Sequence, residues 1–202
     1  MKFLRDSIKR TFSDRQLWLC IPLGMAFALC FNQLISLLGL LDIFPAYKQN
    51  VRNQMFAVPL MTGIILYGLI TPIFEEVLFR WILFGRLKLY MATAAAALGS
   101  SFIFGVYHGN IIQFIYAFLF GIILCFVYSR FNSVIASIIV HGAANVFVYV
   151  TASVGWFSFL GSVHAKIVSV IVGGALGFVI LRMLYLSMPK DRDNYKKWIF
   201  PQ

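Results

Sequence analysis

Charged residues are scarce in this sequence, and acidic ones are rarest. Only 12% of the 202 residues are Asp, Glu, Lys or Arg, and seven of them are acidic. A water-soluble domain carries roughly a quarter of its residues as charges, so the composition excludes that class. The three cysteines, Cys20, Cys30 and Cys125, lie in apolar segments without metal-site spacing, and no H-E-x-x-H motif is present. We interpret the cysteines as small buried apolar side chains.

Apolar residues dominate instead, at 61% of the chain with a mean hydropathy of +0.86. Their long uninterrupted runs favour membrane-spanning helices over the short alternating strands of a barrel. The sequence therefore predicts an all-α fold, a polytopic membrane helix bundle of about six transmembrane helices. The expected spans cover about residues 17–41, 56–84, 91–107, 111–128, 134–151 and 166–188.

The distribution of basic residues predicts the topology. We expect a cytoplasmic N-terminal lead-in over residues 1–16, the bundle over 17–188 and a basic tail over 189–202. With the termini inside, twelve Lys and Arg residues flank the spans on the cytoplasmic side and three on the other. The net charge of +10 is explained by this bias and by contact with the lipid bilayer, so no nucleic-acid partner is expected. We predict an integral multi-pass membrane protein with both termini cytoplasmic.

Three charges interrupt the second apolar segment, in the stretch FEEVLFRW. A charge at membrane depth costs about 2.5–3.5 kcal/mol even on insertion scales, so such charges normally mark a site. Glu76 and Arg80 are four residues apart, which predicts an ion pair on one helix face. Glu75 is rotated by about 100° from Glu76 and lacks that partner. Pro72 is expected to bend the helix just before it.

Other polar residues of the spans can reach the same depth. His108 lies about as far beyond the turn near residue 91 as Glu75 lies before it, and His141 and Asn145 share one helix face. A carboxylate beside an imidazole can deprotonate a water molecule. An imidazole N–H and a carboxamide N–H can stabilise an oxyanion. These residues predict one polar cavity in which a peptide bond is hydrolysed within the membrane.

Three ordered motifs carry a family resemblance over about residues 66–150. E-E-x-x-x-R at 75–80, F-x-x-x-H at 104–108 and H-x-x-x-N at 141–145 resemble the motifs of the CPBP family, which comprises type II CAAX prenyl endopeptidases and bacteriocin-processing and immunity homologues. The resemblance implies an intramembrane endopeptidase, in a bacterial cell membrane, that acts on a membrane-associated, prenylated or hydrophobic peptide or protein.

The resemblance also implies a role for each matching residue. Glu75 and His108 would activate water, while His141 and Asn145 would form the oxyanion hole. Glu76 and Arg80 would support the site. We expect no cofactor, because an asparagine is a poor transition-metal ligand. A divalent metal such as zinc stays open as an alternative.

Two other functions compete with this interpretation. One is a non-catalytic bacteriocin self-immunity or scaffold protein, against which the intact Glu-His-His-Asn set argues. The other is a proton-coupled transporter that uses Glu75 and the histidines as a relay. The lack of a visible duplicated half disfavours the transporter.

Overall fold

A computed structural model describes residues 9, 11–47, 49, 53 and 57–188, and this part of the chain is helical without a β-strand. The predicted basic tail and most of the predicted lead-in lie outside these residues. The elements are η1 (Arg15–Leu19), α2 (Cys20–Leu37), α3 (Leu40–Ile43), α5 (Leu60–Ile65), η2 (Leu66–Ile70), α6 (Thr71–Glu76), η3 (Val77–Phe84), α7 (Gly85–Leu87), α8 (Thr93–Tyr107), α9 (Ile111–Phe131), α10 (Val134–Ser153), α11 (Trp156–Phe159) and α12 (Val163–Leu186).

The predicted all-α membrane bundle is confirmed. Five helical stretches of the described chain are long and apolar enough to cross a bilayer: Arg15–Leu37, Leu60–Leu87, Ile111–Phe131, Val134–Ser153 and Val163–Leu186. The remaining expected span corresponds to α8, which has 15 residues. At 1.5 Å per residue α8 is about 22 Å long, shorter than the hydrocarbon core of roughly 30 Å.

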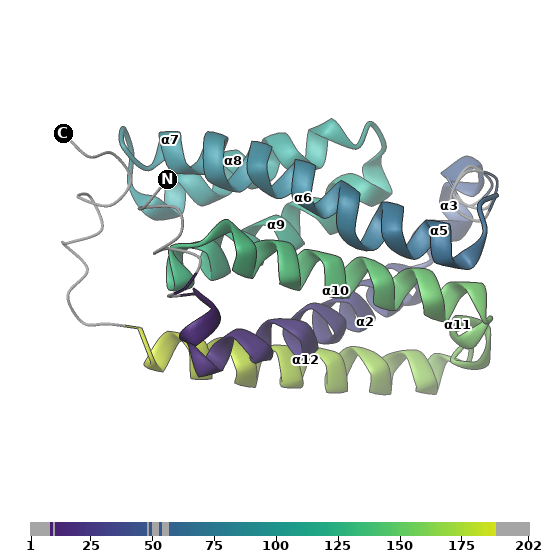
Figure 1. Ribbon diagram of the computed structural model, residues 1–202. Coiled ribbons are helices and arrows are strands. Elements are labelled where there is room, and N and C mark those ends of the chain that lie inside the picture. Colours follow the sequence, from purple (N-terminus) through teal and green to yellow (C-terminus); the bar gives the residue numbers. More distant parts are fainter. Residues whose placement is uncertain (1–8, 10, 48, 50–52, 54–56, 189–202) are drawn as a thin grey trace.

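Helix α10 occupies the centre of the bundle (Figure 1). It packs against α2 on one side and against η2 and α6 on the other, while α12 packs on α2 and the α8–α9 hairpin packs beside η3. Glycines allow the closest of these approaches. A Cβ atom on Gly24 would lie 2.2 Å from the Val140 carbonyl oxygen, and one on Gly142 would lie 2.4 Å from the Gly68 carbonyl oxygen. Small residues permit such backbone contacts between membrane helices.

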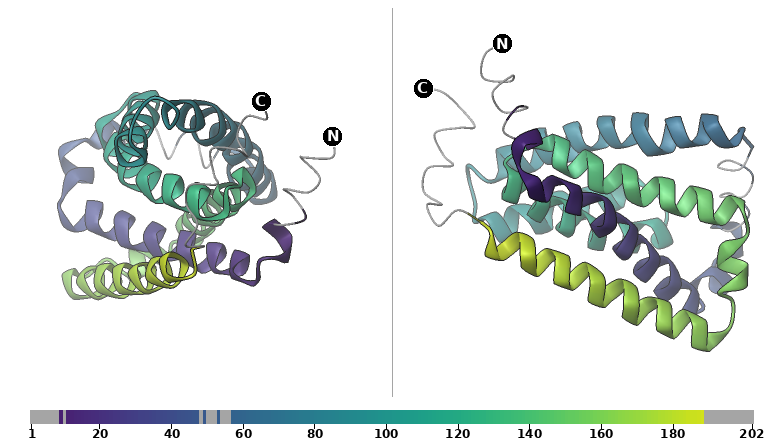
Figure 2. Two further views of the ribbon diagram at one scale, coloured as in Figure 1. Left: turned by 90° about the vertical axis from the view of Figure 1, so that its left-hand side faces the viewer. Right: turned by 60° about the horizontal axis from the view of Figure 1, so that its bottom comes forward.

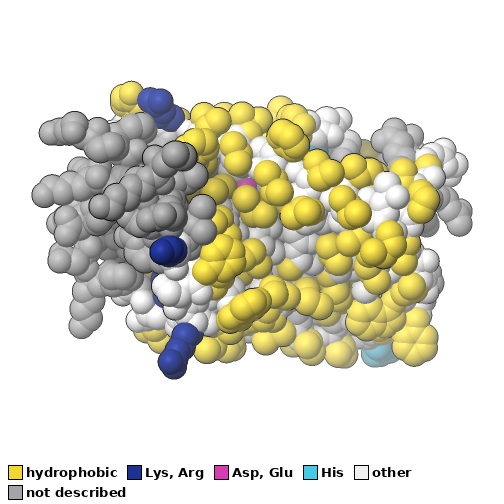
Figure 3. All heavy atoms as spheres, in the orientation of Figure 1, with side chains coloured by type: hydrophobic (Ala, Val, Ile, Leu, Met, Phe, Trp, Pro, Cys, Tyr) yellow, Lys and Arg dark blue, Asp and Glu magenta, His cyan; other side chains and the backbone are white. Residues whose placement is uncertain are grey.

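The described chain begins and ends at the same end of the bundle, as the two views in Figure 2 show. Arg130, in the last turn of α9, connects the first and the last described segments of the chain. Its guanidinium donates to Asp14 at 3.2 Å, to Gln16 at 2.7 Å and to the Leu184 carbonyl at 3.0 Å. The Lys and Arg side chains visible in Figure 3 also gather there. We call this end of the bundle the basic end.

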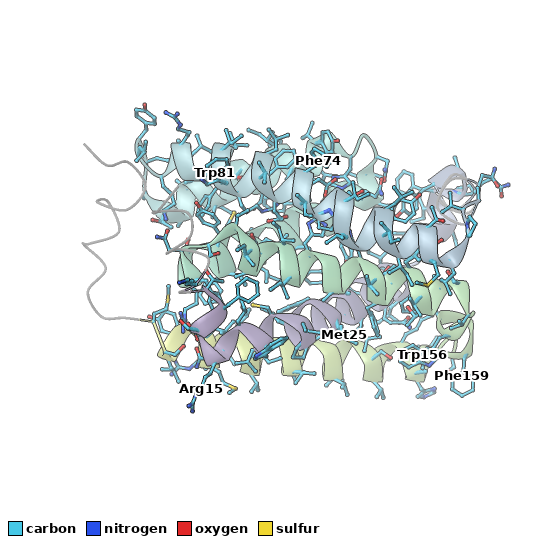
Figure 4. All side chains as sticks on the ribbon, viewed as in Figure 1. Arg15, Met25, Phe74, Trp81, Trp156 and Phe159 are labelled. Carbon is cyan, nitrogen blue, oxygen red and sulfur yellow. The ribbon has the colours of Figure 1, made fainter. Side chains whose placement is uncertain are left out.

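Large apolar side chains cover much of the face of the bundle that Figure 3 shows. Phe74 and Trp81 project outward from the long second helix (Figure 4) and are 72% and 56% exposed. An apolar exterior suits a protein whose surroundings are lipid. Since Phe74 faces outward, the next two residues of the helix turn toward its neighbours, and these are Glu75 and Glu76.

Candidate active site

The second span, Leu60–Leu87, changes its winding around the first motif. The α-helical segment α6 lies between two π-helical segments, η2 and η3. Wider π turns inside α-helices occur frequently at functional sites. Glu75 and Glu76 close α6 directly before η3 begins. The two carboxylates therefore stand where the span departs from regular α-helical hydrogen bonding.

Asn145 compensates for a carbonyl that this winding leaves unpaired. The Thr71 amide donates to the Leu66 carbonyl, five residues back. The equivalent donor for the Tyr67 carbonyl would be residue 72, but this is Pro72, which has no N–H. Asn145 Nδ2 donates to the Tyr67 oxygen instead, at 2.9 Å. One N–H of the amide thus holds α10 against η2.

Glu76 forms the buried centre of the site. Its Oε1 atom lies 2.9 Å from Arg80 Nη1 and accepts from His141 Nδ1 at 2.8 Å. The short distance confirms the ion pair expected from their spacing. Glu76 and Arg80 are both fully buried. The Arg80 N–H groups do not point along the hydrogen-bond direction, although the distance is short. The guanidinium is held by charge and by the Phe104 ring, whose centroid lies 4.2 Å away.

His141 connects the two glutamates. Because Nδ1 donates to Glu76, the ring directs Nε2 toward Glu75, where Oε2 lies 3.6 Å away. That separation is slightly too long for a direct hydrogen bond but lies within ion-pair distance. Glu75 also differs from Glu76 in access, since its side chain is 12% exposed. Glu75 is thus the carboxylate of the pair that a substrate or water can reach.

His108 ends α8 on the same side of the site. Its Nδ1 atom donates to the Phe104 carbonyl at 2.8 Å, which fixes the ring and leaves Nε2 as the second nitrogen. The Phe104 ring lies 4.9 Å from the His108 ring and 5.9 Å from the His141 ring, centroid to centroid. This phenylalanine is the buried apolar wall between the motifs.

Five of the six predicted site residues lie together, and the sixth, Asn145, lies apart from them. Glu75, Glu76, Arg80 and His141 form one contiguous cluster, and His108 adjoins it through the Phe104 ring, which contacts both histidine rings. Asn145 lies one turn beyond His141, with its amide directed at the Tyr67 backbone.

Three supporting features were not predicted from the sequence. They are the Tyr67 carbonyl, the Ser100 hydroxyl that donates to the Phe79 carbonyl of η3 at 2.8 Å, and Gly121. A Cβ atom on Gly121 would lie 3.2 Å from Arg80 Nη2, so the glycine makes room for the buried guanidinium.

The donor set does not favour a metal. Among the described residues, no group of three or more His, Cys, Asp or Glu side chains has the arrangement to hold a metal ion. Both nitrogens of His141 face carboxylates, and His108 Nδ1 is occupied by a carbonyl. Because the residues present do not fit a metal, no step of the chemistry proposed below uses one.

Comparison with known proteins finds one matching family. The family described as "Type II CAAX prenyl endopeptidase Rce1-like" matches residues 57–147, which contain all three motifs. The match covers less than half of the chain and is consistent with the resemblance of these motifs to the CPBP family. No solved structure matches the chain.

Two curated bacterial proteins resemble parts of this chain. "Putative membrane peptidase YdiL" of Bacillus subtilis (strain 168) is 34% identical over 102 residues, which cover 50% of this chain and 41% of YdiL. The chain thus spans less than half the length of that relative. "UPF0177 protein YxdF" of Lactococcus lactis subsp. lactis (strain IL1403) is 29% identical over 150 residues, covering 72% of this chain and 81% of YxdF. The long apolar helices indicate an integral membrane protein.

Proposed function

We propose that the protein is an endopeptidase that hydrolyses a peptide bond of a membrane-associated hydrophobic peptide, using a water molecule activated by Glu75. The observation that carries this proposal is the contact of His141 with both glutamates, 2.8 Å from Glu76 and 3.6 Å from Glu75. An immunity or scaffold protein has no need for a partly exposed carboxylate opposite an oriented imidazole.

The proposed reaction begins with water between Glu75 and the scissile carbonyl. Glu75 accepts one proton as the hydroxyl oxygen adds to the carbonyl carbon, and His108 Nε2 orients the water. The oxyanion receives hydrogen bonds from protonated His141 Nε2 and from the second N–H of Asn145. When the C–N bond breaks, Glu75 returns its proton to the leaving amine. Water is consumed, and one carboxyl and one amine terminus are formed.

Glu76 and Arg80 act through His141 in this scheme. Glu76 holds Nδ1 and thereby sets the direction of Nε2, as the carboxylate of a catalytic triad orients its histidine. Arg80 balances the buried charge of Glu76, because an unpaired carboxylate at this depth would be costly. They are positioning residues, while Glu75, His108, His141 and Asn145 would contact the reacting groups.

The experiment is peptide-terminus profiling in membranes. Membranes containing the wild-type protein or Glu75→Gln would be incubated in ¹⁸O-labelled water with a library of hydrophobic peptides, and the products sequenced by mass spectrometry. We expect new carboxyl termini carrying one ¹⁸O atom with the wild type and a loss of about 10²–10⁴-fold with Glu75→Gln. Identical products from both preparations would contradict the proposal.

A further inference from the structure

The turn between α8 and α9 lies at an unusual depth. Helix α8 starts at the basic end, directly after the connection that carries Lys88, and it ends at Tyr107. Its length of about 22 Å leaves the turn roughly 8 Å short of the opposite side of a 30 Å hydrocarbon core. Figure 1 shows the turn stopping well before the end of the bundle reached by α5, α10 and α12, and Figure 2 agrees.

This turn is polar and is not covered by protein. Asn110 Nδ2 donates to the His108 carbonyl at 3.1 Å, and Asn110 Oδ1 accepts from the Gln113 amide at 2.8 Å. Gly109, with φ of +70°, is exposed, and the neighbouring Tyr107 is 62% exposed. Lipid does not tolerate non-helical backbone at membrane depth unless protein buries it or it lines a water-filled cavity. Because the turn is exposed, the described part of the protein does not bury it. A water-filled cavity is the other condition under which such a turn is tolerated.

We propose that residues 108–110 line an aqueous vestibule that opens at the end of the bundle opposite the basic end and hydrates the active site. His108 connects the two, since it belongs to the turn and its ring lies 4.9 Å from the Phe104 ring, which also contacts the His141 ring at 5.9 Å. The described residues at the basic end include Arg86, Arg130 and Arg182. The positive-inside rule assigns this end to the cytoplasm. The vestibule therefore faces the outside of the cell.

This orientation specifies the substrate class and rests on the proposed peptidase function. A site that takes water from the outer face receives the polar end of a peptide from that face. Its substrate is a hydrophobic peptide segment that has already been exported, with the scissile bond near the outer leaflet. A prenylated protein held at the cytoplasmic leaflet would present its cleavage site to the basic end, away from the vestibule.

Cysteine labelling tests the vestibule independently of catalysis. Tyr107→Cys and Ile111→Cys, which is 47% exposed in the wild type, would be labelled with a membrane-impermeant maleimide, a reaction that requires a hydrated thiolate. Leu98→Cys is the lipid-facing control on the same helix, with the native residue 50% exposed. Tyr90→Cys reports the basic end and Phe159→Cys the opposite end, where the native residues are 80% and 84% exposed. The unsubstituted protein, whose three cysteines are buried, gives the background.

We expect Tyr107→Cys and Ile111→Cys to label from the same side as Phe159→Cys, at comparable rates, while Leu98→Cys stays at background. Labelling from the Tyr90→Cys side would overturn the proposed orientation. Background labelling of both turn variants, with Phe159→Cys reactive, would show that lipid or protein covers the turn. The same labelling in the Glu75→Gln background keeps the result separate from the peptidase proposal, because it needs no turnover.

Discussion

Glu76→Gln removes the charge between Arg80 and His141 while keeping the size of the side chain. In the wild type one carboxylate oxygen serves both partners, at 2.9 Å and 2.8 Å, in a fully buried position. The substitution leaves the Arg80 guanidinium charged and without a hydrogen bond from the described residues, although the Phe104 ring stays in contact with it. Breaking a buried pair in this way costs about 3–5 kcal/mol.

That cost predicts a large fall in thermal stability. For a chain of this length each kcal/mol lowers Tm by roughly 2–4 °C, so we expect Glu76→Gln to unfold about 6–20 °C below the wild type in detergent. Cleavage per folded molecule should also fall, because His141 loses the partner that orients Nε2. Adding Arg80→Met to Glu76→Gln removes the unpaired charge and should recover part of the lost Tm, whereas cleavage should stay low.

Glu75→Gln is the matched control at the adjacent position. The Glu75 side chain is partly exposed and lies 3.6 Å from His141, so its amide should shift Tm by less than about 4 °C, or roughly 1 kcal/mol. Its cleavage rate should nevertheless fall by about 10²–10⁴-fold. Wild-type stability of Glu76→Gln, no recovery in the double variant, or full activity of Glu75→Gln would each refute the division of roles between the two carboxylates.

Three further outcomes follow from the same geometry. Asn145→Ala should cost about 1–3 kcal/mol by leaving the Tyr67 carbonyl unpaired, and Pro72→Ala, which supplies an N–H, should reduce that loss; an additive double variant would contradict the pairing. Gly142→Ala should destabilise the protein by about 1–3 kcal/mol in thermal unfolding, whereas Gly99→Ala, whose Cβ would lie 3.8 Å from the nearest side chain, should not. Cleavage should survive exhaustive chelation, and loss that zinc alone reverses would show a metal requirement.

The local part of the site could be predicted from the sequence because it depends on one helix. The spacing of Glu76 and Arg80 places them on one face whatever the rest of the fold does, and the structure confirms their ion pair. The all-α membrane bundle was equally accessible, since apolar runs of 20 residues or more have few alternatives in lipid. The expected third span was less well determined, because the turn after residue 107 comes before the helix has crossed the core.

The long-range part could not be derived from spacing. His141 contacts Glu76 across 65 residues, and this contact depends on the relative depth and rotation of two helices. Depth counted from the ends of α10 and α6 leaves an uncertainty of several ångströms when helices tilt, which exceeds the margin of a hydrogen bond. The π-helical segments add a rotation that no residue pattern near Leu66 or Val77 announces.

Pro72 explains why an irregular helix can persist in lipid at this point. A missing N–H is costly in a membrane unless a neighbouring helix supplies a donor, so the proline creates a requirement that one specific residue of α10 must meet. Asn145 meets it through Tyr67, and Ser100 donates in the same way to the Phe79 carbonyl of η3. The first motif is thereby fixed to α8 and to α10, the helices that carry the other two motifs. The hydrogen bonds that make the irregular winding tolerable also set the distance between the glutamates and His141.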